Sequence, residues 1–185
     1  MDRCFVFQAG AVGAWKIASI TPVIGDSLVS ADRLAIQPGR PRGAALPSDV
    51  RWQLRGVVSN ERYVTRVEKN ALSEVSPALE RPEATCAALI PITKSATWWN
   101  LTQDERREIL EAKSRHIATG LKYLPAVARR LHHGRDFGEP FDFVTWFEFA
   151  PSDAEAFEQL VAELRRSEEW SYVEREVDVR LVRDP

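Results

Sequence analysis

The chain has 185 residues, a length typical of one globular domain or of two small halves that share a core. Charged residues make up 28% of the sequence with a net charge of −2, whereas a nucleic-acid-binding protein usually has a strong basic excess. The two cysteines form no disulfide framework or metal-spaced cluster, and no apolar run approaches the about 20 residues that span a bilayer.

The first patterned segment covers residues 5–20 and is rich in aromatic and β-branched residues. Gly10 and Gly13 interrupt it, so the pattern predicts a bent strand or two short strands. The charges of Asp2 and Arg3 cancel ahead of this segment, which is not typical of a secretion signal. We therefore expect a cytoplasmic protein.

Turn-forming residues dominate the next stretch of the first half. Residues 21–50, with the run PGRPRG, predict a long irregular connection with room for one short helix. Residues 51–58 predict a strand, and apolar residues near one face predict a short helix around residues 67–75. Residues 84–92 predict a further strand.

The second half opens with a capping-box pattern. Thr102 and Glu105 are spaced so that the hydroxyl and the carboxylate each satisfy a free backbone donor at a helix start. This helix is predicted to continue to about Gly120. Its apolar stripe would consist of Leu110, Ile117, Leu121 and Leu124. Pro125 fits the first turn of a second helix over residues 125–133.

Residues 141–149 predict a strongly aromatic strand. Ser152 and Glu155 form a second capping-box pattern ahead of another helix. The buried stripe of that helix would consist of Phe157, Leu160, Val161 and Leu164. In residues 172–182, apolar residues alternate with charged ones, which is typical of an antiparallel strand with one face in solvent.

The order of these elements predicts an α+β fold, in which helices cover one face of antiparallel sheets. Residues 1–185 would form a single domain. Its two halves, residues 1–93 and 94–185, would each resemble a ferredoxin-like unit, although no sequence repeat is visible. Two such sheets could form a barrel-like core with helices outside.

All three histidines lie between residues 114 and 133. No Ser/His/Asp pattern, HExxH motif or cysteine cluster accompanies them, which disfavours a zinc site. His116 would be either a packed histidine at the helix boundary or the single axial ligand of a metal held by another group, which means haem. His132 and His133 follow basic residues near a predicted helix end, where we expect them on the surface.

An arginine pair and a tryptophan pair can each be interpreted in two ways. Arg129 and Arg130 would point about 100° apart on a helix, so one can face inward and bind a small oxyanion while the other is solvated; the alternative is a surface salt bridge. Trp98 and Trp99 would pack in the core or an interface, or form a planar wall with indole donors for a flat cofactor. Lys94 could add a cationic anchor there.

Another pair of acidic residues, Glu168 and Glu169, precedes Trp170 near a helix end. Both would ordinarily be surface residues. A carboxylate on the second nitrogen of a metal-bound imidazole is nevertheless a recurrent arrangement in metal sites.

Three segments together resemble the chlorite dismutase family of haem b enzymes. They are IPITKSATWWNLTQDERREIL, SRHIATGLKYLPAVARRLHHGRDFGEPFDFVTWFEF and SEEWSYVEREVDVRL. The resemblance covers about residues 50–183, and the chain is similar in length to the family's small, dimeric branch. It implies a homodimeric αβ-barrel of two ferredoxin-like halves, truncated in the N-terminal half and binding haem b in the C-terminal half.

The resemblance also implies a role for each candidate residue. His116 would be the proximal ligand of the haem iron, Glu169 would accept a hydrogen bond from it, and Arg129 would be the mobile distal arginine. The residues implied around the haem edge and the distal pocket are Lys94, Trp98, Trp99, Tyr63, Leu124, Leu131, Thr145 and Phe147.

The implied reaction converts chlorite to chloride and dioxygen through an oxoferryl haem and formation of the O–O bond. Three alternatives remain: a coproheme decarboxylase-like protein, a peroxidase-like haem protein, and a ferredoxin-like dimer without a cofactor. Arg129 favours chlorite chemistry over the first alternative, because that group is expected to lack the distal arginine.

Overall fold

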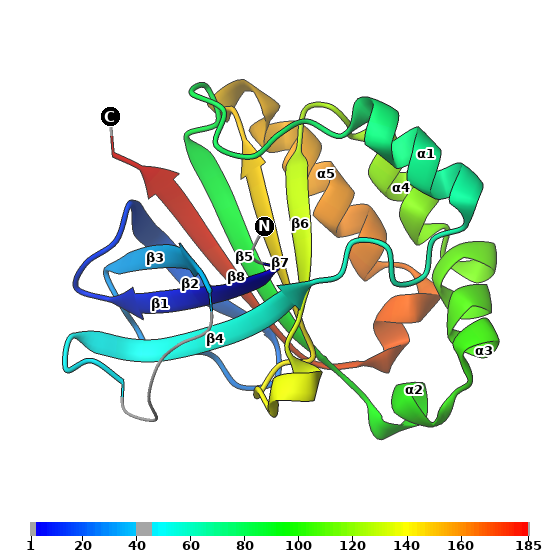
Figure 1. Ribbon diagram of the computed structural model, residues 1–185, viewed down its shortest axis with the longest axis horizontal. Coiled ribbons are helices and arrows are strands. Elements are labelled where there is room, and N and C mark those ends of the chain that lie inside the picture. Colours follow the sequence, from blue (N-terminus) through cyan, green and yellow to red (C-terminus); the bar gives the residue numbers. More distant parts are fainter. Residues whose placement is uncertain (1–2, 40–45, 185) are drawn as a thin grey trace.

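The computed structural model describes residues 3–39 and 46–184. Within these residues, eight antiparallel strands close into a barrel in the order β1-β3-β2-β8-β5-β7-β6-β4 (Figure 1). The strands are β1 (Cys4–Gly10), β2 (Trp15–Ile24), β3 (Arg33–Pro38), β4 (Val50–Val58), β5 (Cys86–Lys94), β6 (Ala128–His133), β7 (Phe143–Phe149) and β8 (Val173–Arg183).

Helices occur in the connection from β4 to β5 and between the strands that follow. The α-helices are α1 (Arg66–Val75), α2 (Ala96–Asn100), α3 (Gln103–Arg107), α4 (His116–Lys122) and α5 (Ala154–Arg165). Glu108–Lys113 is π-helical, and the 3-10 helices are Arg135–Phe137, Pro151–Asp153 and Glu168–Tyr172. None of the described helices is long and apolar enough to cross a membrane.

The interior of the barrel is one hydrophobic core to which both halves of the chain contribute. Phe7, Trp15 and Leu54 from the first half pack with Val144 and Trp146 from the second. The Trp15 and Trp146 rings meet edge to face, with centroids 5.2 Å apart. The two halves are therefore joined by shared packing as well as by strand pairing.

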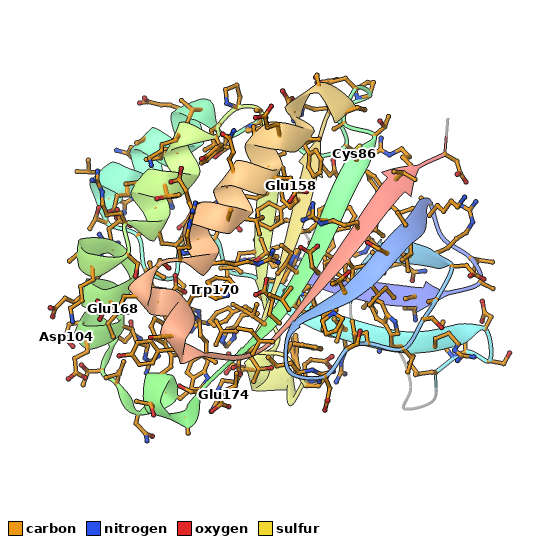
Figure 2. All side chains as sticks on the ribbon, turned by 180° about the vertical axis from the view of Figure 1, so that it is seen from behind. Cys86, Asp104, Glu158, Glu168, Trp170 and Glu174 are labelled. Carbon is orange, nitrogen blue, oxygen red and sulfur yellow. The ribbon has the colours of Figure 1, made fainter. Side chains whose placement is uncertain are left out.

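The helices cover the outer face of only one part of the barrel, formed by β5, β6, β7 and β8 (Figures 1 and 2). Helix α5 packs here through Phe157, whose ring stacks on Phe149 of β7 at a centroid distance of 4.5 Å. Glu158, labelled on α5 in Figure 2, accepts a hydrogen bond of 2.5 Å from Arg180 of β8. The cavity described below lies between these helices and the outer face of the sheet.

Several predicted elements of the first half are correct. The segment from Phe5 forms two strands, with Gly10 and Gly13 at their connection, and strands and a helix occur near residues 51–58, 67–75 and 84–92. The predicted irregular connection is wrong in part, because it contains β3, which pairs with β1 and β2. Most of the PGRPRG run lies outside the described residues.

The predicted second helix over residues 125–133 is wrong. Residues 128–133 form strand β6, which pairs with β7 along its whole length and with the end of β4. Arg129 and Arg130 consequently point to opposite faces of a sheet, rather than 100° apart on a helix. His132 and His133, which we expected on the surface, are 0% and 4% exposed because they lie in this strand.

The predicted helix from Thr102 to Gly120 is interrupted. Its capping box is present, and the Glu105 carboxylate accepts a hydrogen bond from the Thr102 backbone N–H at 2.7 Å. After α3 the chain becomes π-helical and then breaks at Arg115, whose φ of 52° is left-handed. A new helix, α4, begins at His116.

Two predictions for the last part of the chain need correction. Ser152 lies inside a 3-10 turn, and the N-cap of α5 is Asp153, which makes no side-chain capping bond. Glu174 near the start of β8 is exposed to solvent as predicted, whereas the middle of the charged face of this strand is covered by α5. Glu176 and Asp178 are buried there, and both accept hydrogen bonds from Arg165.

Candidate functional site

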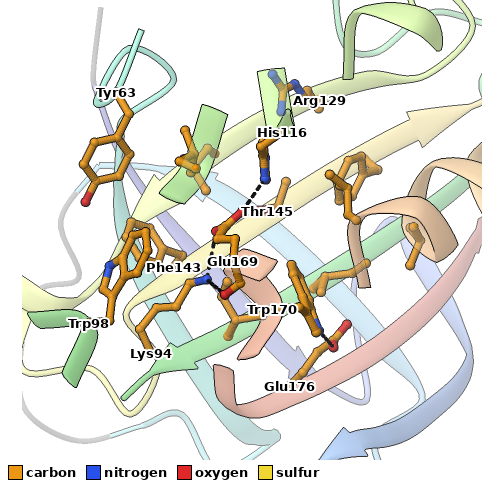
Figure 3. A pocket seen from close by; sticks show the side chains of 17 residues that line it. Tyr63, Lys94, Trp98, His116, Arg129, Phe143, Thr145, Glu169, Trp170 and Glu176 are labelled. Atoms are coloured by element: carbon orange, nitrogen blue, oxygen red, sulfur yellow. Dashed lines mark hydrogen bonds and ion pairs between the residues drawn. The ribbon is translucent and has the colours of Figure 1, made fainter. Parts of the chain in front are cut away.

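A cavity lies between the outer face of β5, β6 and β7 and the helices that cover it (Figure 3). Its volume is about 100 Å³. Most of its lining is apolar, and a few polar and charged side chains project into it. The lining residues are Tyr63, Ile90, Ile92, Lys94, Trp98, Leu110, His116, Arg129, Leu131, Phe143, Thr145, Phe147, Val161, Leu164, Glu169, Trp170 and Glu176.

The break before α4 determines where the His116 ring lies. The Glu111 carboxylate, from the preceding π-helical turn, accepts hydrogen bonds from the backbone N–H groups of Ile117 at 2.7 Å and Ala118 at 3.2 Å. A carboxylate at these free donors stabilises a helix start, because the helix dipole is positive there. His116, the first residue of α4, is thereby held at the edge of the cavity.

His116 and Glu169 form a close pair. The Nδ1 atom of His116 lies 2.6 Å from Oε2 of Glu169, and the Glu169 backbone N–H donates to the Ser114 hydroxyl oxygen at 2.8 Å. This arrangement assigns the ring proton to Nδ1. The Nε2 atom then carries the free lone pair, and it makes no hydrogen bond to any described residue.

The Glu169 carboxylate is buried and also accepts a hydrogen bond from a cation. The Lys94 ammonium donates to Oε1 of Glu169 at 2.8 Å and lies 4.7 Å and 5.5 Å from the ring centroids of Trp98 and Trp170. Burial raises the pKa of the Glu169 carboxyl, but the nearby His116 and Lys94 outweigh it and lower this pKa to about 2. The carboxylate is therefore ionised at neutral pH.

Arg129 projects from β6 toward the same cavity and has no compensating carboxylate. Its side chain makes no hydrogen bond or ion pair with any described residue, and burial lowers the pKa of its guanidinium. The guanidinium lies against Gly120 of α4, where an added Cβ would be 3.5 Å from Nη2. An unpaired guanidinium in a mostly apolar cavity is a site for a small anion.

Two further donors in the cavity lack partners. The Tyr63 hydroxyl and the Trp98 Nε1 atom are both buried and form no hydrogen bond with a described residue. Buried polar groups are ordinarily paired, so such atoms point to an acceptor that a ligand would supply. Together with Nε2 of His116, they give the cavity one metal-binding nitrogen and donors suited to carboxylates.

The structure brings together most of the residues that the sequence predicts for this site. The cavity is lined by Tyr63, Lys94, Trp98, His116, Arg129, Leu131, Thr145, Phe147 and Glu169. Leu124 and Trp99 are not among its lining residues. Instead, Trp99 donates its indole N–H to Asp142 at 3.0 Å, and its ring stacks on Phe143.

Other lining residues were not predicted. Trp170 donates its indole N–H to Glu176 at 3.0 Å, and Glu176 is fully buried and bound to Arg165. Ile90 and Ile92 of β5 face the cavity with Phe143 of β7. The apolar sequences of these two strands indicate that they are buried, but they do not indicate that one face borders a cavity rather than a packed helix.

The described residues contain no group of three or more His, Cys, Asp or Glu side chains that could hold a metal ion. A metal at this site would have to be carried by a cofactor, with His116 as its protein ligand.

Comparisons with known proteins agree on one family. The family model described as chlorite dismutase matches residues 45–183. A chlorite dismutase from Ideonella dechloratans is 32% identical over 129 residues, which cover 68% of this chain and 42% of that relative. The chain thus spans less than half the length of this curated relative.

Solved structures give the same result. The chain is similar to the dimeric chlorite dismutase from Nitrobacter winogradskyi, with 60% identity, a TM-score of 0.90, and coverage of 97% of this chain and 99% of the other. The fold also matches a chlorite dismutase from Candidatus Nitrospira defluvii in complex with imidazole. There the identity is 18%, the TM-score 0.67, and the coverage 100% and 92%. The chain belongs to the chlorite dismutase family.

Proposed function

We propose that this protein is a haem-dependent chlorite dismutase that converts chlorite to chloride and dioxygen. The observation that carries the proposal is the arrangement of the cavity, where the His116–Glu169 pair and the unpartnered Arg129 guanidinium line the same apolar space. Family membership and the similarity to the Nitrobacter winogradskyi enzyme support the same activity.

The residues of the cavity fit haem by their chemistry. Nε2 of His116 would bind the iron, and the unpartnered donors of Tyr63 and Trp98 would meet the propionates. The volume of about 100 Å³ is below the about 300 Å³ of a typical small-molecule site, so the lining side chains must move apart to admit the group. Bound haem would supply the redox-active iron that the decomposition of chlorite requires.

Glu169, Lys94 and Arg129 would each have a separate role around the bound group. Glu169 accepts the Nδ1 proton of His116, which fixes the tautomer and makes the ring a stronger donor to a metal. Lys94 holds the carboxylate in place and balances its charge, and its ammonium is therefore not a free anchor for a propionate. Arg129 binds the chlorite anion in surroundings that screen its charge poorly.

An oxygen electrode tests this function directly. The haem-loaded protein should release one O₂ for each chlorite consumed, because ClO₂⁻ contains the two oxygen atoms of the product. Arg129→Ala should retain the Soret band of bound haem and lose at least about tenfold in kcat/KM, since a hydrogen-bonded charge contributes about 1.5–3 kcal/mol. The exposed Arg166 offers a matched control substitution. A haem-loaded protein that releases no oxygen would contradict the proposal.

We further propose that the chain forms a homodimer and acts in the cytoplasm. The Nitrobacter winogradskyi enzyme is dimeric, and it matches nearly the whole of this chain. Light scattering coupled to size exclusion should give twice the chain mass of 20.9 kDa. A monomeric mass at micromolar concentration would contradict the homodimer.

We also infer that the fold consists of two ferredoxin-like halves. The order β5, α4, β6, β7, α5, β8 follows the β-α-β-β-α-β pattern of that unit, and these four strands are neighbours in the barrel. Strands β1 to β4 with α1 would be the truncated counterpart. This division assigns β5 to the second half, so its boundary would precede Cys86 rather than follow residue 93.

A further inference from the structure

The sheet separates the cavity described above from a second one, and the two adjacent arginines of β6 lie on opposite sides of the sheet. Arg129, paired with Phe147 of β7, faces the cavity described above, whereas Arg130, paired with Trp146, faces the barrel interior. There it lines a second cavity of about 900 Å³ at one end of the barrel. Among the other residues that line this second cavity are Phe5, Trp15, Trp146, Glu148 and Arg183.

The guanidinium groups in the second cavity have unused donors. Arg130 donates only its Nε–H, to Nε2 of His132 at 3.2 Å, and its guanidinium lies 3.9 Å from the centroid of the Phe5 ring. Arg183 forms no side-chain hydrogen bond with a described residue, and its Nη2 atom lies 4.0 Å from Oε2 of Glu148. Both arginines therefore present N–H groups without an acceptor among the described residues.

The carboxylate nearest to these two guanidinium groups, that of Glu148, already accepts hydrogen bonds from other residues. Glu148 is 3% exposed and accepts hydrogen bonds from the Trp146 indole at 2.8 Å and from the Glu80 backbone at 2.5 Å. With Arg3, the cavity lining holds three arginines against Glu80 and Glu148. Among the described lining residues there is consequently an excess of positive charge and there are more donors than acceptors.

The remaining walls are apolar and aromatic. Trp15 and Trp146 meet edge to face at 5.2 Å, and the Arg183 guanidinium lies 4.5 Å from the Trp15 centroid. The volume is within the range of sites for organic molecules and far exceeds that of an inorganic oxyanion. A ligand that satisfies both sets of groups would combine a flat apolar body with a carboxylate.

We propose that the second cavity binds a small aromatic carboxylate, with its carboxylate on the unused guanidinium donors of Arg130 and Arg183 and its ring against the aromatic lining. A planar guanidinium can bind a carboxylate through two N–H groups, and the aromatic walls provide the apolar contact area. This site is separate from the His116 cavity and does not depend on the proposed chlorite activity.

Calorimetric titration of the haem-loaded protein with 2-naphthoate tests the proposal. We expect one ligand per chain, and we expect the neutral analogue 2-naphthamide to bind at least tenfold more weakly. Equal affinities for the two compounds, or no binding of 2-naphthoate at millimolar concentration, would overturn the proposal.

Substitutions locate the bound probe. Arg130→Met and Arg183→Met should each weaken 2-naphthoate binding at least tenfold, while Arg166→Met on the exposed end of α5 should leave it unchanged. Two variants are used so that the test survives if one of them fails to fold. The Soret band and the thermal midpoint show whether each variant is folded. Unchanged affinity in both folded variants, or loss of binding on Arg129→Met instead, would sink the assignment.

Discussion

At the scale of single residues, Glu169 has the most demanding environment in the site. The residue is 3% exposed, and its carboxylate is shared by the Lys94 ammonium and the His116 ring. The neighbouring Glu168 is exposed and contacts only Lys113, at 3.4 Å, among the described side chains of opposite charge. Two identical side chains, adjacent in the sequence, thus have opposite surroundings.

We predict that Glu169→Gln destabilises the haem-free chain by about 3 kcal/mol, because removing one partner of a buried ion pair leaves the Lys94 charge uncompensated. Urea denaturation at pH 7 measures this change. Glu168→Gln is the matched control and should stay within about 0.5 kcal/mol of the original chain. Equal losses in the two variants would show that the buried pair does not contribute as described.

The buried ring of His132 should make the free energy of unfolding depend on pH. Burial lowers the pKa of its ring from 6.5 to about 4, an effect that the nearby Arg130 charge reinforces and the hydrogen bond to the Val144 carbonyl opposes. Between these pH values the unfolded chain binds a proton that the folded chain does not. The stability that His132 contributes is therefore present above pH 6.5 and is lost as the pH falls toward 4.

The expected loss from His132 is about 2 kcal/mol between pH 7 and pH 5, because a pKa difference of one between the folded and unfolded chain corresponds to about 1.36 kcal/mol. Urea denaturation at the two pH values measures it. His132→Asn retains a side-chain donor for Val144 but has no proton to gain, so its stability should change less over the same interval. The same slope in both proteins would exclude His132 as its source.

The sequence predicts which residues line the site better than it predicts the contacts that those residues make. The resemblance to a known family selected His116, Glu169 and Arg129, and all three line one cavity. It did not reveal that Lys94 is bound to Glu169, or that Trp99 turns toward Asp142. Those contacts join residues far apart in the chain, and only the closed fold sets which donor reaches which acceptor.

At the scale of elements, the start of α4 positions the nitrogen proposed to bind iron. The chain reaches His116 through a π-helical turn and the left-handed Arg115, and the Glu111 carboxylate caps the new helix. Irregular turns of this kind often occur beside functional sites. Here the break aligns His116 with Glu169, whereas an unbroken helix would carry His116 in a different direction.

We predict that Glu111→Gln weakens haem retention and lowers the free energy of unfolding by about 1 kcal/mol, because an amide caps a helix less well than a carboxylate. Haem release to an excess of an apoglobin measures the retention. Glu108→Gln, in the same π-helical turn but on its exposed side, is the control. Faster haem release in both variants alike would exclude capping as the cause.

Strand β6 shows why some elements could not be predicted from the sequence. Residues 125–133 contain alanine, arginine and leucine, which favour helices, and a proline suited to a helix start. The strand forms because β7 and β4 offer backbone partners on its two sides. Tertiary pairing therefore outweighs local propensity, and it is this pairing that sends Arg129 and Arg130 into different cavities.

At the scale of the whole molecule, closure of the barrel makes the two halves depend on each other. Strand β8 of the second half pairs with β2, and β6 pairs with β4, so the first half covers both edges of the second. The shared interior also places Trp15 against Trp146. A separated second half would expose two strand edges and the apolar inner face of its sheet.

We therefore predict that a fragment of residues 84–185 does not fold by itself, even though it contains all of the cavity residues except Tyr63. The intact chain should unfold in a single cooperative transition, with tryptophan fluorescence and far-ultraviolet circular dichroism giving the same midpoint. The fragment should show no such transition and should associate through its exposed strands. A fragment that stays monomeric, melts cooperatively and binds haem would contradict the shared core, because the second half would then be stable without the packing of Phe7, Trp15 and Leu54.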